Sequence, residues 1–562
     1  MNLNPTKKPF LSSFFLSLFC FVSAFTFFIS FFQTDDDLFT ILITKGIGVA
    51  VKPSEYIFFM NFLVGLGLKT LNTLNDRVPW YGIFLAFTLF LGLWAFLMAV
   101  LLTKNPVNKL LLFAPCFLGI DLYFFINFHY TSISLLTCEG ALLLLISSIE
   151  NRVASLKPIA LSGTCLLIAS LIRLDAFLLS GLLFFPFLFK LMTLLIKDPL
   201  KNSKNIYGLT FFIILIISSS FTSRLYFQRS PDWKTFNQLI VPLTRLIDYR
   251  NFEYDDKTKK YFDEIQWNRT DTDLFRNWFF LDKKKYSLEN LIKLDGSLPL
   301  HNLDKKNQVY PPELIFTNGF SKICFLYFLC LIIFVPLKKV WIPCLSLAWV
   351  FAIHYFLYYF MKSPPWIYCP LLVFPTYLCI YHSVFPIPQK NSKNFIAIKT
   401  ERNLKTLLLL LLIAVSILIA SINYFNNKKK EHFETLLKET IYDLHPSPNQ
   451  LYVVWHNTIP YEEISVFDDS REFKNFNIFQ LQGFQRSPVN QEILDHFGIK
   501  NLFSEMVDNP NLFMICTPEE GDLYQKFMLE KYKLVVLPKN VFHCPFFNVF
   551  KIFSLKNPAK HS

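Results

Sequence analysis

The sequence predicts a polytopic α-helical membrane protein with about 11 transmembrane helices and a small C-terminal α/β domain outside the membrane. Of its 562 residues, 53% are apolar and only 17% are charged, whereas a water-soluble protein usually carries about a quarter charged residues. Apolar runs long enough to cross a bilayer recur along most of the chain. These observations exclude both an ordinary soluble enzyme and a single-pass receptor.

The first predicted span contains no charged residue between Phe10 and Phe32. It is longer than the apolar core of a signal peptide, so we expect it to stay in the protein. Residues 55–75 are amphipathic and are expected to lie at the membrane interface. Two charged residues interrupt the 158–195 region, which favours either two short helices or one broken helix. The other predicted spans are 80–102, 107–127, 131–149, 158–173, 176–195, 206–226, 318–337, 340–360, 366–386 and 406–425.

Short loops rich in Lys and Arg alternate with loops that are poor in them, and the positive-inside rule then places the N-terminus in the cytoplasm. Lys428-Lys429-Lys430 falls on the outer side and is an exception to this orientation. Cytoplasmic basic loops account for the net charge of +13, so no nucleic-acid partner is expected. The abundance of Phe, Lys, Asn and Ile is typical of an AT-rich bacterial genome and indicates the cytoplasmic (inner) membrane.

This orientation divides the chain into four parts. They are an N-terminal transmembrane module with an acidic first outer loop (1–226), an extracytoplasmic loop region (227–317), a second transmembrane module (318–427) and an extracytoplasmic α/β domain (428–562).

The α/β domain is predicted from short strand patterns at Leu451–Trp455, Leu512–Cys516 and Leu534–Leu537. Thr517-Pro518-Glu519-Glu520 has the pattern of a helix start, with Thr at the cap, Pro in the first turn and Glu three residues on. This helix is expected to run to about Lys531.

The cysteines point to no cofactor. Nine of the 11 lie in or beside apolar segments, where free thiols behave as small hydrophobic side chains. No Cys/His spacing indicates a zinc site, and no glycine pattern indicates a nucleotide. Cys516 and Cys544 lie in the polar tail, and the sequence leaves open whether they form a disulfide.

Three consecutive aspartates, Asp35, Asp36 and Asp37, follow the first span directly. One interpretation is a solvated cap that keeps the helix end out of the lipid. The other is an acidic site just outside the membrane, which acts as a general base or binds a divalent cation such as Mg²⁺ or Mn²⁺. A neighbouring carboxylate raises the proton affinity of such a base.

Four charged residues within the predicted spans fall in the outer half of the membrane, on the same side as the aspartates: Asp121, Glu139, Arg173 and Asp175. Ionisable groups at this depth usually face a bundle interior or a wet cavity. The pattern therefore predicts a polar cavity that opens outward, with a buried structural pair of Glu139 and Arg173 as the alternative. His129 and Tyr130 are candidates to line the same cavity, although interfacial aromatic residues are common.

Several motifs carry a family resemblance. They are Asp36-Asp37-Leu38-Phe39, Gly46, Asn61, Pro79-Trp80-Tyr81-Gly82, Asn277-Trp278 and Asp282. This pattern resembles multi-pass membrane glycosyltransferases of the GT-C superfamily, and in particular an uncharacterised bacterial branch. The resemblance extends over roughly residues 10–425.

The resemblance implies transfer of a sugar from a polyprenyl-phosphate-linked donor to an envelope glycan, lipid or protein acceptor at the outer membrane face. The acidic residue of the family corresponds to Asp36 or Asp37, although Asp35 is an extra acid and Leu38 replaces an expected aromatic residue. Some members need a divalent metal. Arg173 is a candidate phosphate ligand, because a guanidinium group matches phosphate oxygens in a fork.

Two other functions fit the composition. A transporter or flippase would have broken helices at matching places in two halves, and no such repeat is found. A non-catalytic scaffold whose outer domains bind partners is the second alternative.

Overall fold

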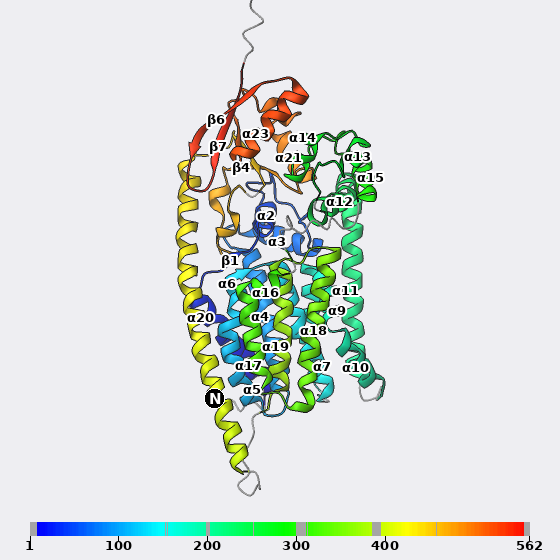
Figure 1. The fold of residues 1–562 in the computed structure, drawn as a ribbon, viewed down its shortest axis with the longest axis vertical. Coiled ribbons are helices and arrows are strands. Elements are labelled where there is room, and N and C mark those ends of the chain that lie inside the picture. The colour runs from blue at the N-terminus through cyan, green and yellow to red at the C-terminus, as the bar shows by residue number, and fades with distance from the viewer. Residues whose placement is uncertain are drawn as a thin grey trace, which may run out of the picture.

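The computed structural model describes residues 8–151, 153, 155–197, 203–250, 252–298, 311, 313–384, 395–456 and 458–555. A bundle of long helices forms one end of the molecule, and an α/β domain with a helical region beside it forms the other (Figure 1). Two shorter helices, α2 (Asp35–Lys45) and α3 (Phe62–Leu74), lie between these two ends. The expected combination of a helical membrane body and a C-terminal sheet domain is therefore present.

The bundle contains α1 (Pro9–Phe27), α4 (Trp80–Leu101), α5 (Pro106–Cys116), the π-helical turn η1 (Phe117–Asp121), α6 (Leu122–Ile126), α7 (Tyr130–Glu150), α8 (Lys157–Ile172), α9 (Leu174–Leu183), α10 (Phe185–Lys197), α11 (Ser203–Arg229), α17 (Gly319–Ile332), α18 (Leu337–Phe360), α19 (Pro365–His382) and α20 (Phe395–Asp443).

Among the described residues, seven helices are long and apolar enough to cross a membrane, or eight if the bent pair α9 and α10 is one span. α8 and α17 occupy predicted spans but have only 16 and 14 residues, fewer than the roughly 20 that a bilayer requires. The expected count of about 11 is therefore not confirmed. α3, with 13 residues, is likewise too short to span.

Two predicted boundaries differ from the structure. α1 ends at Phe27 because Phe28 adopts an extended conformation (φ −130°, ψ 139°), and the chain then enters the short strand β1 (Phe31–Phe32). These residues are apolar, so hydropathy contains no sign of the change. At the other end of the membrane body, α20 runs for 49 residues without a break and lies along the C-terminal domain (Figure 1).

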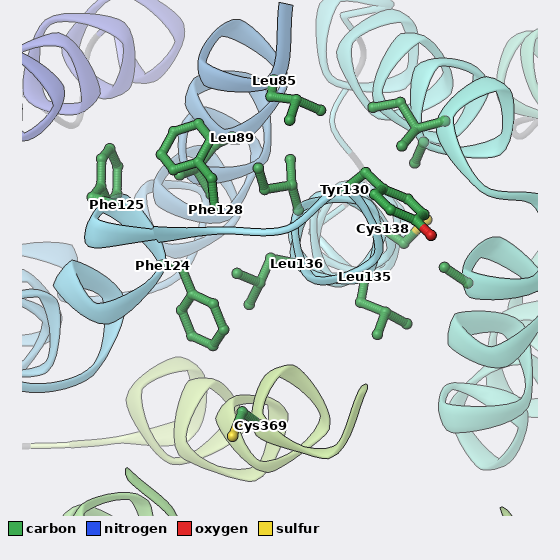
Figure 2. Close-up of a cluster of buried hydrophobic side chains, with 14 of the residues drawn as sticks. Leu85, Leu89, Phe124, Phe125, Phe128, Tyr130, Leu135, Leu136, Cys138 and Cys369 are labelled. Carbon is green, nitrogen blue, oxygen red and sulfur yellow. The ribbon is translucent and has the colours of Figure 1, made fainter. Parts of the chain in front are cut away.

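α7 is the central helix of the bundle, since every residue from Tyr130 to Ile149 is buried. Figure 2 shows side chains of α4, α6 and α7 gathered in one apolar cluster, with α19 beside them. Small polar residues on α7 join it to its neighbours: Ser134 Oγ donates to the carbonyl of Ala169 at 2.9 Å, and Thr137 Oγ1 to that of Thr88 at 3.1 Å. Such contacts replace the hydrophobic driving force that is missing between helices in lipid.

The crossing of α4 and α7 depends on glycine. A Cβ atom placed on Gly140 would lie 2.3 Å from the carbonyl oxygen of Gly92. This backbone atom cannot move aside as the end of a flexible side chain would, so the two helices approach as closely as they do because neither residue has a side chain.

We expect Gly140→Ala to lower the stability of the bundle by about 1–3 kcal/mol, the usual range for overpacking a filled core. Gly181→Ala is the matched control, because a Cβ atom there meets nothing within 4 Å and alanine favours the helix. Thermal unfolding of the two variants in the same lipid tests this, and an unchanged midpoint for Gly140→Ala would contradict the close packing.

The C-terminal domain is built on a five-stranded sheet in the order β4 (Asn477–Leu481), β3 (Leu451–Trp455), β5 (Leu512–Ile515), β7 (Asn548–Ser554) and β6 (Val536–His543). The first three strands are parallel, and the last two are antiparallel to their neighbours. The predicted strands at 451 and 512 are present, the third begins later than expected, and β4 and β7 were not predicted.

The predicted helix start in this domain is confirmed in detail. Thr517 caps α23 (Pro518–Phe527) in a capping box with Glu520, and a π-helical turn extends it to Tyr532. Cys516 and Cys544, which sequence left as a possible pair, are free thiols in the structure.

The outer loop region forms a second small core beside this sheet. Its helices are α12 (Pro231–Thr244), the π-helical turn η2 (Arg245–Tyr249), α13 (Lys259–Asp263), α14 (Arg269–Arg276) and α15 (Leu288–Ser297). Glu530 of the C-terminal domain accepts hydrogen bonds from Asn268 at 2.9 Å and Thr270 at 2.8 Å. Lys531 forms an ion pair with Asp282. The two outer regions therefore contact each other directly.

Candidate active site

The three aspartates occupy the first turn of α2. Just before them, β1 pairs in parallel with β2 (Asn127–Phe128), with Phe31 opposite Asn127 and Phe32 opposite Phe128. Gln33 extends this ladder by donating its N–H to the carbonyl of Phe128 at 2.9 Å. Because His129 and Tyr130 follow β2 directly, the pairing brings the start of α7 next to the start of α2.

Asp37 is fully buried. The hydroxyl of Tyr81, at the start of α4, donates to Asp37 Oδ1 at 2.6 Å, and Oδ2 has no hydrogen-bond partner among the described residues. Burial raises the pKa of Asp37 well above its ordinary value, and the hydrogen bond from Tyr81 opposes that rise. These contacts make Asp37 a positioning residue that fixes α2 to the helix bundle.

Asp36 is partly exposed, unlike Asp37. Burial and the neighbouring Asp35 raise the pKa of Asp36 to about 7, while the positive charges of Arg173 and Lys362 oppose this rise. A carboxyl group with a pKa near the working pH suits general-base catalysis. Asp35 is also partly exposed, but its carboxylate accepts a hydrogen bond from Gln482, so Asp36 is the better candidate for the base.

Arg173 lies at the break between α8 and α9, where the backbone is extended (φ −152°, ψ 106°). Its Nη1 donates to the hydroxyl of Tyr130 at 2.8 Å, and its guanidinium lies over the rings of Phe59 and Tyr130, 4.8 and 5.3 Å from their centroids. Asp175 is largely exposed and lies 3.9 Å from Arg173 Nε. The helix break thus gives a planar cation a fixed aromatic support beside Asp36.

A second cation comes from the turn between α18 and α19. Lys362 forms an ion pair of 2.9 Å with Asp248 of η2, and its charge acts on both Asp36 and His129. His129 caps α7 by accepting the N–H of Thr131 at its Nδ1 (3.0 Å). Burial, reinforced by Arg173 and Lys362, lowers the pKa of His129 well below its ordinary value, so it is neutral near pH 7.

The C-terminal domain reaches into the same site. Gln482 Nε2 donates to Asp35 Oδ2 and contacts His456 Nδ1 at 3.1 Å. Burial raises the pKa of Asp35, and the hydrogen bond from Gln482 opposes the rise. The charges of Asp248 and Lys362 also act on His456. The site is therefore assembled from the membrane bundle, the outer loop region and the C-terminal domain together.

The other end of α2 is held by Lys45. Its Nζ donates to the backbone carbonyls of Asp76 at 2.8 Å and Asp469 at 2.7 Å. These bonds join the C-terminal end of α2 to the α3–α4 turn and to the C-terminal domain, and a cation near the last carbonyls of a helix is also favourable for its dipole. α2 is thus fixed at both ends.

The structure brings together Asp36, Arg173, His129 and Tyr130 but places Glu139 elsewhere. Glu139 lies nine residues after Tyr130 on α7, which corresponds to about 13 Å along the helix. It is fully buried, and neither of its oxygens has a hydrogen-bond partner among the described residues. The charged group that acts on it is Asp121, which accepts a hydrogen bond of 2.9 Å from Tyr377. These two acids belong to the bundle interior.

The aspartate triplet, which the sequence leaves open as a metal site, does not have its carboxylates arranged around one point. Asp35 is bonded to Gln482 and Asp37 to Tyr81, so the three carboxylates are directed to different partners. In the described part of the chain, the carboxylates that converge closely enough for one ion are Asp468, Asp469 and Glu472. Lys438 and Arg471 already form ion pairs with two of these three acids.

Sequence reasoning missed Lys362, Asp248, Gln482 and His456 as site residues. The one available signal was Lys362, a lone lysine on the predicted outer side where basic residues are rare. The other three lie in polar segments far from Asp36 in sequence, and no local pattern distinguishes them from ordinary surface residues.

Comparison with known proteins gives one structural likeness. No family model matches the chain, and no curated protein matches it. Its fold is similar to that in the crystal structure of ArnT from Cupriavidus metallidurans bound to undecaprenyl phosphate, with a TM-score of 0.40 and 10% sequence identity over 97% of this chain and 98% of that chain. At this level of similarity, function has to be argued from the residues of this chain.

We expect Tyr81→Phe to lower the stability of the protein by about 1–3 kcal/mol, because it leaves a buried carboxyl group without its hydrogen-bond donor. Tyr207→Phe is the matched control, since Tyr207 is 75% exposed on α11. Thermal unfolding measures the difference. Equal midpoints for the two variants would show that Asp37 does not depend on Tyr81.

Proposed function

We propose that the protein is a membrane glycosyltransferase that moves a sugar from a polyprenyl-phosphate-linked donor to an acceptor hydroxyl at the outer face of the membrane. The observation that carries this proposal is the partly exposed Asp36, whose pKa is influenced by two cations, Arg173 and Lys362. A base and an anion-binding pair are the groups that such a transfer needs, and here they lie where the helix bundle meets the outer domains.

Asp36 accepts the proton of the acceptor hydroxyl. The hydroxyl oxygen then forms a bond to the anomeric carbon of the sugar, while the bond from that carbon to the phosphate oxygen breaks and its electron pair leaves with the lipid phosphate. Arg173 offers a planar fork of N–H donors for the phosphate, and Lys362 offers a point charge. Both stabilise the negative charge that grows on the leaving group.

The proposed role of Arg173 in phosphate binding is supported by the contacts that hold its side chain in place. Phe59 and Tyr130 fix the guanidinium plane, and Nη1 donates to the hydroxyl of Tyr130 at 2.8 Å. A preorganised cation of this kind needs little rearrangement when an anion binds.

We further infer that the site faces the outside of a bacterial inner membrane. The basic short loops place the N-terminus inside, and the C-terminal domain then lies on the same outer side as Asp36. Lys428-Lys429-Lys430 is the exception to this orientation. Lys428 forms an ion pair of 2.6 Å with Glu431, and Lys430 lies over the ring of Phe31, so protein groups engage these charges.

Removal of the base tests the proposal directly. We expect Asp36→Asn to lower turnover by about 10²–10⁴-fold while the protein remains folded. The measurement is transfer or hydrolysis from a panel of polyprenyl-phosphate sugars by purified protein in lipid nanodiscs. Asp232→Asn, an exposed acid on α12, is the control and should keep wild-type activity.

If wild-type protein turns over no donor of the panel, the glycosyltransferase proposal is wrong. If Asp36→Asn retains full turnover, the proposed reaction stands, but Asp36 is not its general base.

The pH profile gives a second test. Because the base acts only when it is deprotonated, we expect the rate to rise with pH through about 7, the pKa of Asp36, and to level off above it. Arg173 and Lys362 both lower this pKa, so Arg173→Gln and Lys362→Gln should each shift the rise to higher pH.

Lys234→Gln removes an exposed charge on α12 and should leave the midpoint unchanged. A shift to lower pH in either site variant would contradict the placement of these cations beside Asp36.

A further inference from the structure

Two partly exposed rings meet where the outer loop region touches the C-terminal domain. The indole of Trp278 follows α14, and the imidazole of His456 follows β3. Their ring centroids are 5.4 Å apart, with the planes inclined by 42°. No step of the proposed transfer uses either residue, yet His456 is joined to Asp35 through Gln482.

Trp278 is held in an unusual backbone conformation. Its φ is +58°, in the left-handed region that bulky residues rarely adopt. Gln485 Nε2 donates to the carbonyl of Trp278 at 2.6 Å, and Trp455 Nε1 donates to that of Asn277 at 2.8 Å. Strain of this kind persists where the surroundings enforce it and is concentrated at binding sites. The C-terminal domain therefore holds this indole in a fixed place.

The indole of Trp278 is partly exposed. Gly483 lies against it, and a Cβ atom on Gly483 would be 3.5 Å from the indole carbon Cζ3. The adjacent Gln482 bridges to His456. A flat aromatic surface beside a few fixed polar groups is the usual composition of a small-molecule pocket.

The hydrogen bonds of Gln482 indicate which ring nitrogen of His456 carries the proton. Gln482 contacts Asp35 Oδ2 through its amide nitrogen, which can only donate. The same nitrogen faces His456 Nδ1, which therefore accepts, and in the neutral ring the proton is on Nε2. Burial lowers the pKa of His456 to about 4, with Lys362 acting in the same direction and Asp248 against it. At neutral pH the ring offers an N–H donor without charge.

We propose that Trp278 and His456 form the acceptor subsite and that it takes a carbohydrate. The C–H face of a pyranose ring stacks on the indole of Trp278, and one of its hydroxyl groups accepts the Nε2–H of His456. A neutral imidazole and an amide suit hydroxyl groups, whereas a phosphate would favour the cations Arg173 and Lys362. This inference rests on the proposed glycosyl transfer and adds the class of acceptor.

The test is direct binding, which needs no turnover. The probes are the methyl glycosides of glucose, galactose, mannose and N-acetylglucosamine, offered to purified protein in lipid nanodiscs and followed by saturation-transfer NMR. We expect at least one glycoside to bind, with transfer to its ring C–H protons. Trp278→Ala should weaken that binding by about tenfold or more, as for an aromatic anchor, and His456→Ala should weaken it less.

Trp341→Ala is the control, because Trp341 is 61% exposed on α18 and should not affect binding. Trp278→Phe keeps an aromatic face and should retain part of the affinity, which separates loss of stacking from loss of folding. Thermal midpoints of all variants are measured in parallel.

The proposal is overturned if no glycoside binds to the wild type, or if Trp278→Ala binds as tightly as Trp341→Ala. Lost binding in Trp278→Ala with unchanged hydrolysis of the donor supports it, because water then replaces the missing acceptor. Glycoside binding through Trp278 without turnover of any donor would retain the subsite and reject the glycosyltransferase function, so the two failures are distinguishable.

Discussion

The parallel pairing of β1 with β2 is the contact on which the candidate site depends. It consists of two residues on each strand, and it joins the chain just before α2 to the chain just before α7. It sets the first turn of α2, which carries Asp36, beside the first turn of α7, which begins at Tyr130. The pairing is also tied to the C-terminal domain, since Ser30 accepts the backbone N–H of Val466 at 2.8 Å. A short ladder therefore sets the geometry of a site drawn from distant segments.

Around this ladder, each aspartate of the triplet has a separate environment. Asp37 is buried and meets Tyr81, Asp35 meets Gln482 of the C-terminal domain, and Asp36 is partly exposed, as is Asp35. Consecutive residues in a helix point about 100° apart, so three adjacent acids reach three different surroundings. The same spacing explains why they do not converge on one cation.

The sequence identified site residues where a charged side chain is energetically unfavourable in its predicted surroundings. Acids at the end of an apolar helix and an arginine within a span are both unfavourable in lipid, so Asp36 and Arg173 were noticeable. The same criterion selected Glu139, because the sequence does not show whether a charged residue in a span faces the candidate site or the interior of the bundle. His456, Gln482 and Asp248 lie in polar segments, where such residues are ordinary. Their role comes from long-range contacts that no local pattern records, and β4 and β7 were missed for similar reasons.

The unbroken course of α20 has a mechanical consequence. At 1.5 Å per residue, its 49 residues form a rod of about 73 Å, and no flexible linker separates its membrane part from the part that lies along the sheet. Membrane helices adapt to bilayer thickness by tilting. We expect a tilt of this rod to act on the domain that holds His456 and Gln482, and the contacts of that domain with α2 to bear the resulting load when the bilayer thickness changes.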